Sequence, residues 1–283
     1  MRHFIAWLAC FFSSSLFALG NSAEIEWHNA TPTTAHKEEV PQWIRHGINK
    51  TVSALGELPN NLIPVSLYYM KHAKEPVPWG EIARGKLDGI KLYIDKGASL
   101  DSLIADWTLY HELAHLYHPF LDNQDSWLAE GLATYFQNVI MLQGGIISQS
   151  EFVARIQAGL SRGERATRQF SGQLSQISSQ MWQLKAHQRV YWSGVAFFIE
   201  AELKLQSECA DCNIAKLLAH YQLCCRDNLT LNTSQNATVF LSSFDKLIES
   251  KLFETLYKRY KARRDFPFIS KSHINMILMR YAK

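Results

Sequence analysis

Two histidines four residues apart are the feature of this sequence best suited to chemistry. They stand in the stretch His111-Glu112-Leu113-Ala114-His115. Residues four positions apart on a helix lie on one face, so both imidazoles would point the same way and could bind one metal ion. Glu112 is turned off that face, where it can take a proton from water and later protonate a leaving amine. The pattern predicts part of a zinc site with a general base beside it.

A carboxylate in the next helical segment offers the missing ligand. Glu130 lies within the stretch Trp-Leu-Ala-Glu-Gly-Leu-Ala-Thr-Tyr at 127–135, and fourteen residues separate it from His115. Pro119 falls in this interval and is expected to end the first helix, so that a loop can reverse the chain. Catalytic zinc takes three protein ligands and leaves one position for a water, which it activates. We therefore predict one Zn²⁺ held by His111, His115 and Glu130.

These motifs resemble those of the gluzincin zinc metallopeptidases, especially the aminopeptidase N and glycyl aminopeptidase branches. The resemblance covers residues 111–135, and Tyr-Trp-Ser-Gly at 191–194 is similar to a Tyr-x-x-Gly that opens a later helix in these families. It implies that Tyr191 donates a hydrogen bond to the oxyanion of the tetrahedral intermediate, a task that suits a phenol near a metal. An aromatic stripe of Tyr191, Phe197 and Phe198 would also be typical of core packing.

Three further residues are secondary candidates. Thr134, four residues after Glu130, occupies the place where gluzincins keep a hydrogen-bond partner for a ligand histidine. His187 and Arg189, just before Tyr191, could aid binding of substrate or oxyanion, although single residues of these types are more often structural.

Two departures from the family limit what the resemblance implies. Aminopeptidase N relatives carry a Gly-x-Met-Glu-Asn strand whose glutamate holds the free amine of the substrate. The segment Gly-Ile-Lys-Leu-Tyr at 89–93, which we place at that point, has no acid there, so strict aminopeptidase activity is not expected. The interval between His115 and Glu130 is also a few residues shorter, which implies a trimmed loop. The extended metzincin pattern lacks its third histidine here, which argues against that class.

The helices and strands that must position these residues can be read from sequence patterns. Together they indicate an α+β, predominantly helical, zincin-like domain. Helical spacing begins near residue 43, strands are expected at 65–70 and 90–94, and Asp101 is placed to cap a first metal helix over 102–117. Further helical segments are expected near 127–143, 148–161, 189–207, 213–224 and 237–262.

The expected organisation is one catalytic unit over 40–283. The chain after the leader divides into an N-terminal α/β part, 24–125, with a small mixed sheet and the first metal helix, and a helical part, 126–283, that carries the third ligand. The strand at 90–94 is expected to be an edge strand that pairs the extended backbone of a peptide substrate. Residues 30–41 are rich in Thr, Pro and charge and are expected to be mobile, and the stretch 169–180 reads as either a poor helix or a loop.

Composition and the N-terminal residues limit which classes of protein this sequence can belong to. The 283 residues carry a formal charge of +3, which gives little support for nucleic-acid binding, and the basic run at 258–264 is read as a solvated helix face. Residues 1–23 have a basic start, an apolar stretch and small residues at the end, as in a secretory signal. The protein is expected to be exported, periplasmic or extracellular, with an uncleaved leader that anchors it in the membrane as the alternative.

Export makes disulfides the default for the cysteines that remain after Cys10 leaves with the leader. These are Cys209, Cys212, Cys224 and Cys225, whose pairing the sequence leaves open. A structural zinc knot is the less favoured alternative, because adjacent cysteines make awkward tetrahedral ligands.

The combined hypothesis is an exported zinc peptidase acting on a peptide or protein. The choice between endopeptidase and exopeptidase, the specificity and the oligomeric state stay open. Two other classes compete with it: a non-catalytic binding protein stabilised by zinc, and a zinc hydrolase of a non-peptide amide or ester.

Overall fold

The computed structural model describes residues 21–226 and 236–282. The predicted leader, residues 1–23, lies outside this range except for its last three residues. Ser22 and Ala23 open a strand that the sequence did not suggest. Within the described ranges, none of the helices has the length and hydropathy needed to cross a membrane.

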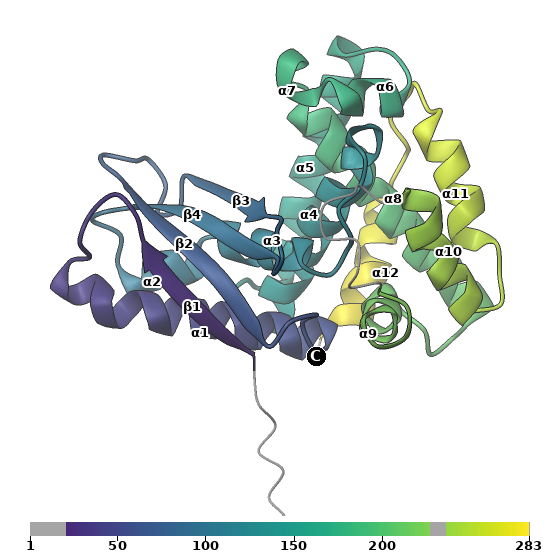
Figure 1. The fold of residues 1–283 in the computed structure, drawn as a ribbon. Helices are drawn as coiled ribbons and strands as arrows, with labels where there is room; N and C mark the ends of the chain where they lie inside the picture. The colour runs from purple at the N-terminus through teal and green to yellow at the C-terminus, as the bar shows by residue number, and fades with distance from the viewer. Residues whose placement is uncertain (1–20, 227–235, 283) are drawn as a thin grey trace, which may run out of the picture.

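A mixed sheet of four strands forms the N-terminal part (Figure 1). The strands are β1 (Ser22–Trp27), β2 (Leu62–Met70), β3 (Trp79–Ala83) and β4 (Gly89–Asp95). The order in the sheet is β1-β2-β4-β3, with β1, β2 and β4 parallel and β3 antiparallel to β4. The predicted strands at 65–70 and 90–94 and the small mixed sheet are thus confirmed.

The prediction that 90–94 is the edge strand is wrong. β4 pairs with β2 on one side and with β3 on the other, so β3 is the edge next to the helical part. β3 was missed because Pro76, Pro78 and Gly80 read as turn residues. Both prolines precede the strand, and β3 alternates too weakly between buried and exposed positions to be recognised.

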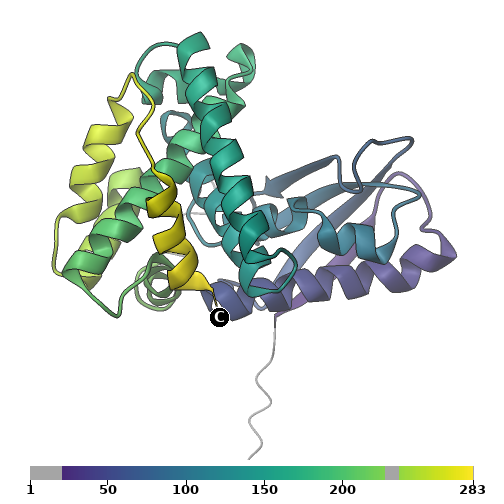
Figure 2. The ribbon, with the colours of Figure 1, turned by 180° about the vertical axis from the view of Figure 1, so that it is seen from behind.

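Alternation of side chains along β2 and β4 gives the sheet one apolar face. Val65, Leu67, Leu92 and Ile94 are fully buried on that face, and the intervening residues are partly exposed. The long helix α1 (Thr34–Leu55) covers it, as Figures 1 and 2 show.

Helix α1 begins well before the expected position. The hydroxyl of Thr33 accepts a hydrogen bond from the His36 amide at 3.1 Å and caps the helix, which then runs through Pro41. The predicted mobile stretch at 30–41 is therefore wrong from Thr34 onward. The buried face of α1 already starts at His36 and Val40, ahead of the apolar spacing that begins at Trp43.

The single helix predicted over 102–117 is two helices, α2 (Leu100–Ala105) and α3 (Thr108–His115). Asp106 has extended backbone between them, and its carboxylate accepts the Thr108 amide at 2.8 Å, which starts α3 anew. The N-cap of α2 is Ser99 and not Asp101, which lies in the first turn.

The rest of the described chain is helical. It comprises α4 (Ser126–Gln143), α5 (Gln149–Gln169), α6 (Leu174–Ser179), α7 (Met181–Leu184), α8 (His187–Glu208), α9 (Ile214–Cys224), α10 (Ala237–Leu247), α11 (Leu252–Lys261) and α12 (Lys271–Tyr281). Most predicted segments are confirmed, the segment 237–262 is two helices, and α12 was missed. The stretch 169–180, for which both a poor helix and a loop were considered, contains α6.

Helix α3 lies where the two parts of the molecule meet. It packs against β3 on one side and against α4 on the other, and α4 in turn packs against α8, which also contacts α5 (Figure 1). The predicted α+β, predominantly helical class is confirmed.

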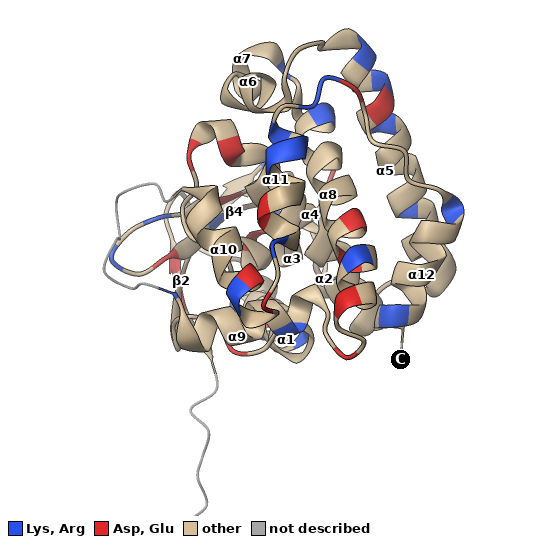
Figure 3. Ribbon diagram, turned by 90° about the vertical axis from the view of Figure 1, so that its right-hand side faces the viewer, with Lys and Arg blue, Asp and Glu red and all other residues tan. Residues whose placement is uncertain are grey.

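Two further expectations concern cysteines and charge. The structure pairs Cys209 with Cys212 and Cys224 with Cys225, one of the three possible pairings. In the basic run, Lys258 lies 2.6 Å from Glu254, and the ribbon in Figure 3 shows acidic and basic residues interspersed along the helices. Lys258 and Arg259 are exposed on α11, as expected, whereas Tyr260 is buried and residues 262–264 follow the end of the helix.

Candidate active site

Helix α3 presents both histidines of the first motif to one point. His111 and His115 are buried, at 3% and 5% exposure, and their Nε2 atoms lie 3.1 Å apart. The four-residue spacing on a regular helix is the local cause of this geometry.

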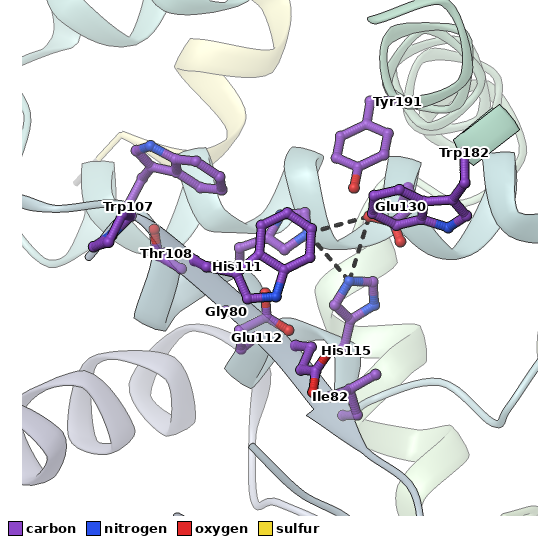
Figure 4. Close-up of a pocket in the computed structure, with 13 residues that line it drawn as sticks. Gly80, Ile82, Trp107, Thr108, His111, Glu112, His115, Glu130, Trp182 and Tyr191 are labelled. Carbon is purple, nitrogen blue, oxygen red and sulfur yellow. Dashed lines mark hydrogen bonds and ion pairs between the residues drawn. The ribbon is translucent and has the colours of Figure 1, made fainter. Parts of the chain in front are cut away.

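Helix α4 brings a carboxylate to the same point (Figure 4). Oε2 of Glu130 lies 3.3 Å from Nε2 of His111 and 3.6 Å from Nε2 of His115. Tetrahedral Zn²⁺ with bonds of about 2.1 Å separates its ligand atoms by about 3.4 Å. The three measured separations bracket this value, so the residues fit the metal. In the described part of the chain, these three are the group of His, Cys, Asp and Glu side chains arranged to hold an ion.

The charge states of two carboxyl groups differ because their neighbours differ. Burial alone would raise the pKa of Glu130, but the neighbouring imidazoles of His115 and His111 lower it well below its usual range. Burial raises the pKa of Glu112 to about 7, although the charge of His111 opposes this. One carboxylate is therefore held ionised as a ligand, and the other can exchange a proton near neutral pH.

Strand β3 passes directly over Glu112 at a glycine. A Cβ atom on Gly80 would lie 2.9 Å from Oε1 of Glu112 and 2.7 Å from Cγ2 of Thr108. Any side chain at this position would push against the carboxylate, so Gly80 permits the edge strand to approach the site closely.

Each ligand histidine has a hydrogen-bond partner behind it. Nδ1 of His111 lies 2.8 Å from Oε1 of Gln137, and Nδ1 of His115 lies 2.8 Å from Nε2 of His118. Thr134, predicted for this role, does not fill it, because its buried hydroxyl oxygen has no hydrogen-bond partner among the described residues. Gln137, seven positions after Glu130, shares its helix face, and that spacing was the available signal.

Helices α4 and α8 cross at two glycines. A Cβ on Gly131 would lie 2.3 Å from Cα of Gly194, and a Cβ on Gly194 would lie 2.0 Å from the carbonyl oxygen of Trp127. Only residues without a side chain allow this approach. The glycines of both motifs thus bring Glu130 on α4 and Tyr191 on α8 to the same cavity.

Tyr191 lies in a different environment from Phe197 and Phe198, the other two aromatic residues on its helix. Its ring stacks on that of His111, with centroids 5.9 Å apart and planes 12° apart, whereas Phe197 and Phe198 are fully buried in the core. Burial, with the neighbouring Glu130 carboxylate, raises the pKa of Tyr191 well above its usual value. The phenol therefore stays protonated and can donate a hydrogen bond.

Of the secondary candidates, Arg189 has a structural contact. Its buried guanidinium donates to the carbonyl of Gly172 at 2.6 Å and does not line the cavity. The ring of His187 stands edge-on to that of Tyr191, with centroids 6.3 Å apart.

The cavity over the metal ligands has about 240 Å³ of space and an aromatic rim. Trp79 of β3, Trp107 before α3 and Trp182 of α7 line it and are 43%, 40% and 57% exposed. Trp79 and Trp182 meet across the cavity with ring centroids 5.8 Å apart. Sequence reasoning missed all three, because widely separated tryptophans carry no local pattern.

The edge strand carries an acidic residue. This corrects the comparison of residues 89–93 with the Gly-x-Met-Glu-Asn strand of aminopeptidase N relatives. The strand at the site is β3, and it contains Glu81, which lines the cavity and pairs with Lys91 of β4 at 2.9 Å. The absence of an acid was therefore inferred from the wrong strand.

Comparison with known proteins gives a family match over part of the chain and a shared fold. A model of the M61 glycyl aminopeptidase family matches residues 115–202, less than half of the chain, a range that includes His115, Glu130 and Tyr191. No curated protein sequence matches the chain.

Solved structures share the fold at low sequence identity. An M1 zinc metallopeptidase from Deinococcus radiodurans has a TM-score of 0.50 and 18% identity over 88% of this chain and 50% of its own. An aminopeptidase N family protein from Idiomarina loihiensis has a TM-score of 0.55 and 13% identity over 90% of this chain and 46% of its own. A mutant of a two-domain M1 zinc metallopeptidase bound to L-tryptophan has a TM-score of 0.51 and 16% identity over 87% and 49%.

The chain spans about half the length of these solved structures. The matches confirm the resemblance to gluzincin peptidases that the motifs indicated. At these sequence identities the solved structures show a shared fold.

Proposed function

We propose that this domain is a zinc-dependent peptidase in which His111, His115 and Glu130 hold one Zn²⁺ and Glu112 is the general base. The observation that carries the proposal is the set of three ligand atoms 3.1 to 3.6 Å apart beside a buried carboxyl group. When bound, zinc supplies a Lewis acid that lowers the pKa of water and polarises a carbonyl.

Glu112 has the surroundings that a base and acid for this reaction needs. A pKa of about 7 in the metal-free site allows the carboxylate to take a proton from the attacking water and return it to the leaving amine near neutral pH. The phenol of Tyr191, on the opposite wall of the cavity in Figure 4, donates to the oxyanion as charge develops there.

Strand β3 offers the substrate a place to bind. Among the described residues, β3 pairs with β4 on one side and with no strand on the other, so an extended peptide can add to its free edge above Glu112. Glu81 is already paired with Lys91 at 2.9 Å, so a substrate amine would have to compete with this lysine for the carboxylate. We therefore propose cleavage that does not require a free N-terminus.

The test of the function is metal analysis with a peptide library that contains both free and N-acetylated peptides. The purified protein is expected to hold one Zn²⁺ per chain, lose cleavage on treatment with a chelator, and regain it on addition of Zn²⁺. Zinc without cleavage of any peptide would support the non-catalytic alternative. Cleavage of esters or other amides alone would support the non-peptide hydrolase, and a requirement for free amines would contradict the reading of Glu81.

The aromatic rim predicts preference for large apolar or aromatic side chains beside the scissile bond. Trp79→Ala is expected to lower kcat/KM for such peptides by about tenfold relative to peptides with alanine there, because an aromatic contact contributes about 1.4 kcal/mol. Competing-substrate assays would measure the ratio. Phe268→Ala, which removes an 84% exposed ring outside the cavity, is the control. An unchanged ratio in Trp79→Ala would exclude the rim from specificity.

We also propose that the protein is exported. Two features support this: the leader-like sequence at 1–23 and the two disulfides that the cysteines form. Sequencing the N-terminus of the mature protein recovered outside the cytoplasm would test it.

A further inference from the structure

His118 is a buried polar residue that the proposed chemistry does not use. Its side chain is 2% exposed and lies between two groups. Nδ1 is 2.6 Å from the carbonyl oxygen of Pro119, and Nε2 is 2.8 Å from Nδ1 of His115. Three positions after His115, it lies just beyond the end of α3.

The contact between His118 and the Pro119 carbonyl determines where the protons lie in the contact between His118 and His115. A carbonyl oxygen accepts hydrogen bonds and cannot donate them, so the N–H of a neutral His118 ring must be on Nδ1. Nε2 of His118 then has a lone pair and accepts. The hydrogen bond between the rings is satisfied only if His115 carries its N–H on Nδ1, which leaves the lone pair of its Nε2 directed to Glu130 and His111.

We propose that His118 is a positioning residue that fixes the tautomer and orientation of His115 for metal binding. The Pro119 carbonyl is the fixed acceptor at the far end of this series of hydrogen bonds. A neutral imidazole thus does the work for which many zinc sites use a carboxylate or a backbone carbonyl. The inference rests on the proposed metal site, but not on the substrate or on peptide cleavage.

The other ligand histidine is held differently, which makes the comparison informative. His111 has a side-chain amide behind it, from Gln137 at 2.8 Å. An amide can turn to present either its oxygen or its nitrogen, whereas the Pro119 carbonyl offers His118 one choice.

The first experiment needs no variant. Two-bond ¹H–¹⁵N spectra of the full-length protein with ¹⁵N-labelled histidine, before and after addition of Zn²⁺, report which nitrogen of each ring carries the proton. We expect Nδ1–H in both His118 and His115, already in the metal-free protein. An Nε2–H tautomer in His118 would overturn the proposal, even if peptides are cleaved. Correct tautomers without peptide cleavage would count against the proposed function alone.

The second experiment compares variants by Zn²⁺ affinity in competition with a chelator. His118→Leu removes the acceptor and is expected to weaken binding by about 10- to 100-fold. His118→Gln keeps an acceptor near the position of Nε2 and is expected to restore most of the affinity. Gln222→Leu is the structural control, because Gln222 donates to the Tyr117 carbonyl at 2.7 Å at the same helix end without touching an imidazole. Equal affinity in the wild type and His118→Leu, or equal loss in both His118 variants, would contradict the proposal.

Discussion

Replacement of Glu112 by glutamine is expected to lower kcat by about 10²- to 10⁴-fold, the contribution typical of general acid–base catalysis. The amide fills the same buried space under Gly80 but cannot accept a proton. Because Glu112 is not among the three ligand residues, the variant should still bind one Zn²⁺. Steady-state kinetics with metal analysis would measure both quantities.

The matched control for this variant is Glu81→Gln, which makes the same change in a carboxylate that lines the cavity but pairs with Lys91. It should retain most of the activity. Full activity in Glu112→Gln would remove Glu112 from the mechanism, and loss of zinc would mean that the effect is on the metal site.

The same residue sets the acid side of the pH profile. A carboxyl group accepts a proton only when it is ionised, so kcat/KM should rise as pH increases through the pKa of Glu112. Burial raises that pKa from 4.5 to about 7 in the metal-free site, and the charge of a bound cation lowers it again. The acid limb is therefore expected between these values. A limb that persists unchanged in the residual activity of Glu112→Gln would have another origin.

The second large effect is expected from one methyl group at Gly194. Gly194→Ala would place a Cβ 2.0 Å from the Trp127 carbonyl and 2.6 Å from Cα of Gly131, both backbone atoms that cannot rotate away. Helices α4 and α8 must then separate, which should destabilise the fold by about 1–3 kcal/mol. A displacement of about 1 Å between Glu130 and Tyr191 would cost on the order of 10²-fold in activity. Denaturant unfolding and kinetics would measure the two effects.

Gly85→Ala is the control for the added methyl group, since the nearest atom to its Cβ would be 3.6 Å away. A double-mutant cycle separates the causes. If Gly194→Ala acts through Tyr191, it should lower activity less in a Tyr191→Phe background than in the wild type. Additive effects would show that Gly194→Ala does not act through the Tyr191 hydroxyl.

The candidate metal site was readable from the sequence because its spacing is local. The four-residue spacing of His111 and His115 is a property of any α-helix, and the structure places both rings as that spacing predicts. The carboxylate of Glu130 could be assigned to the same ion only with a second motif, because nothing in its own helix indicates what lies opposite. The break at Asp106 escaped notice, since an Asp whose carboxylate accepts the amide two residues later reads equally well inside a helix.

The edge strand and the residues around the ligands could not be read in this way. Which strand forms the edge depends on pairing between distant segments, and the more apolar stretch at 90–94 proved to be interior for that very reason. His118 and Gln137 look like ordinary helix residues until their partners are known.

The sequence by itself determined the candidate metal ligands, the proposed base and the helical character of most of the chain, because residue type and spacing along a helix act over a few positions. Only the tertiary structure decided that β3 lies over Glu112, that α4 and α8 touch at Gly131 and Gly194, and that tryptophans from three segments surround one cavity. These contacts join residues far apart in the chain, and they arise from the packing of whole elements, which no local pattern records.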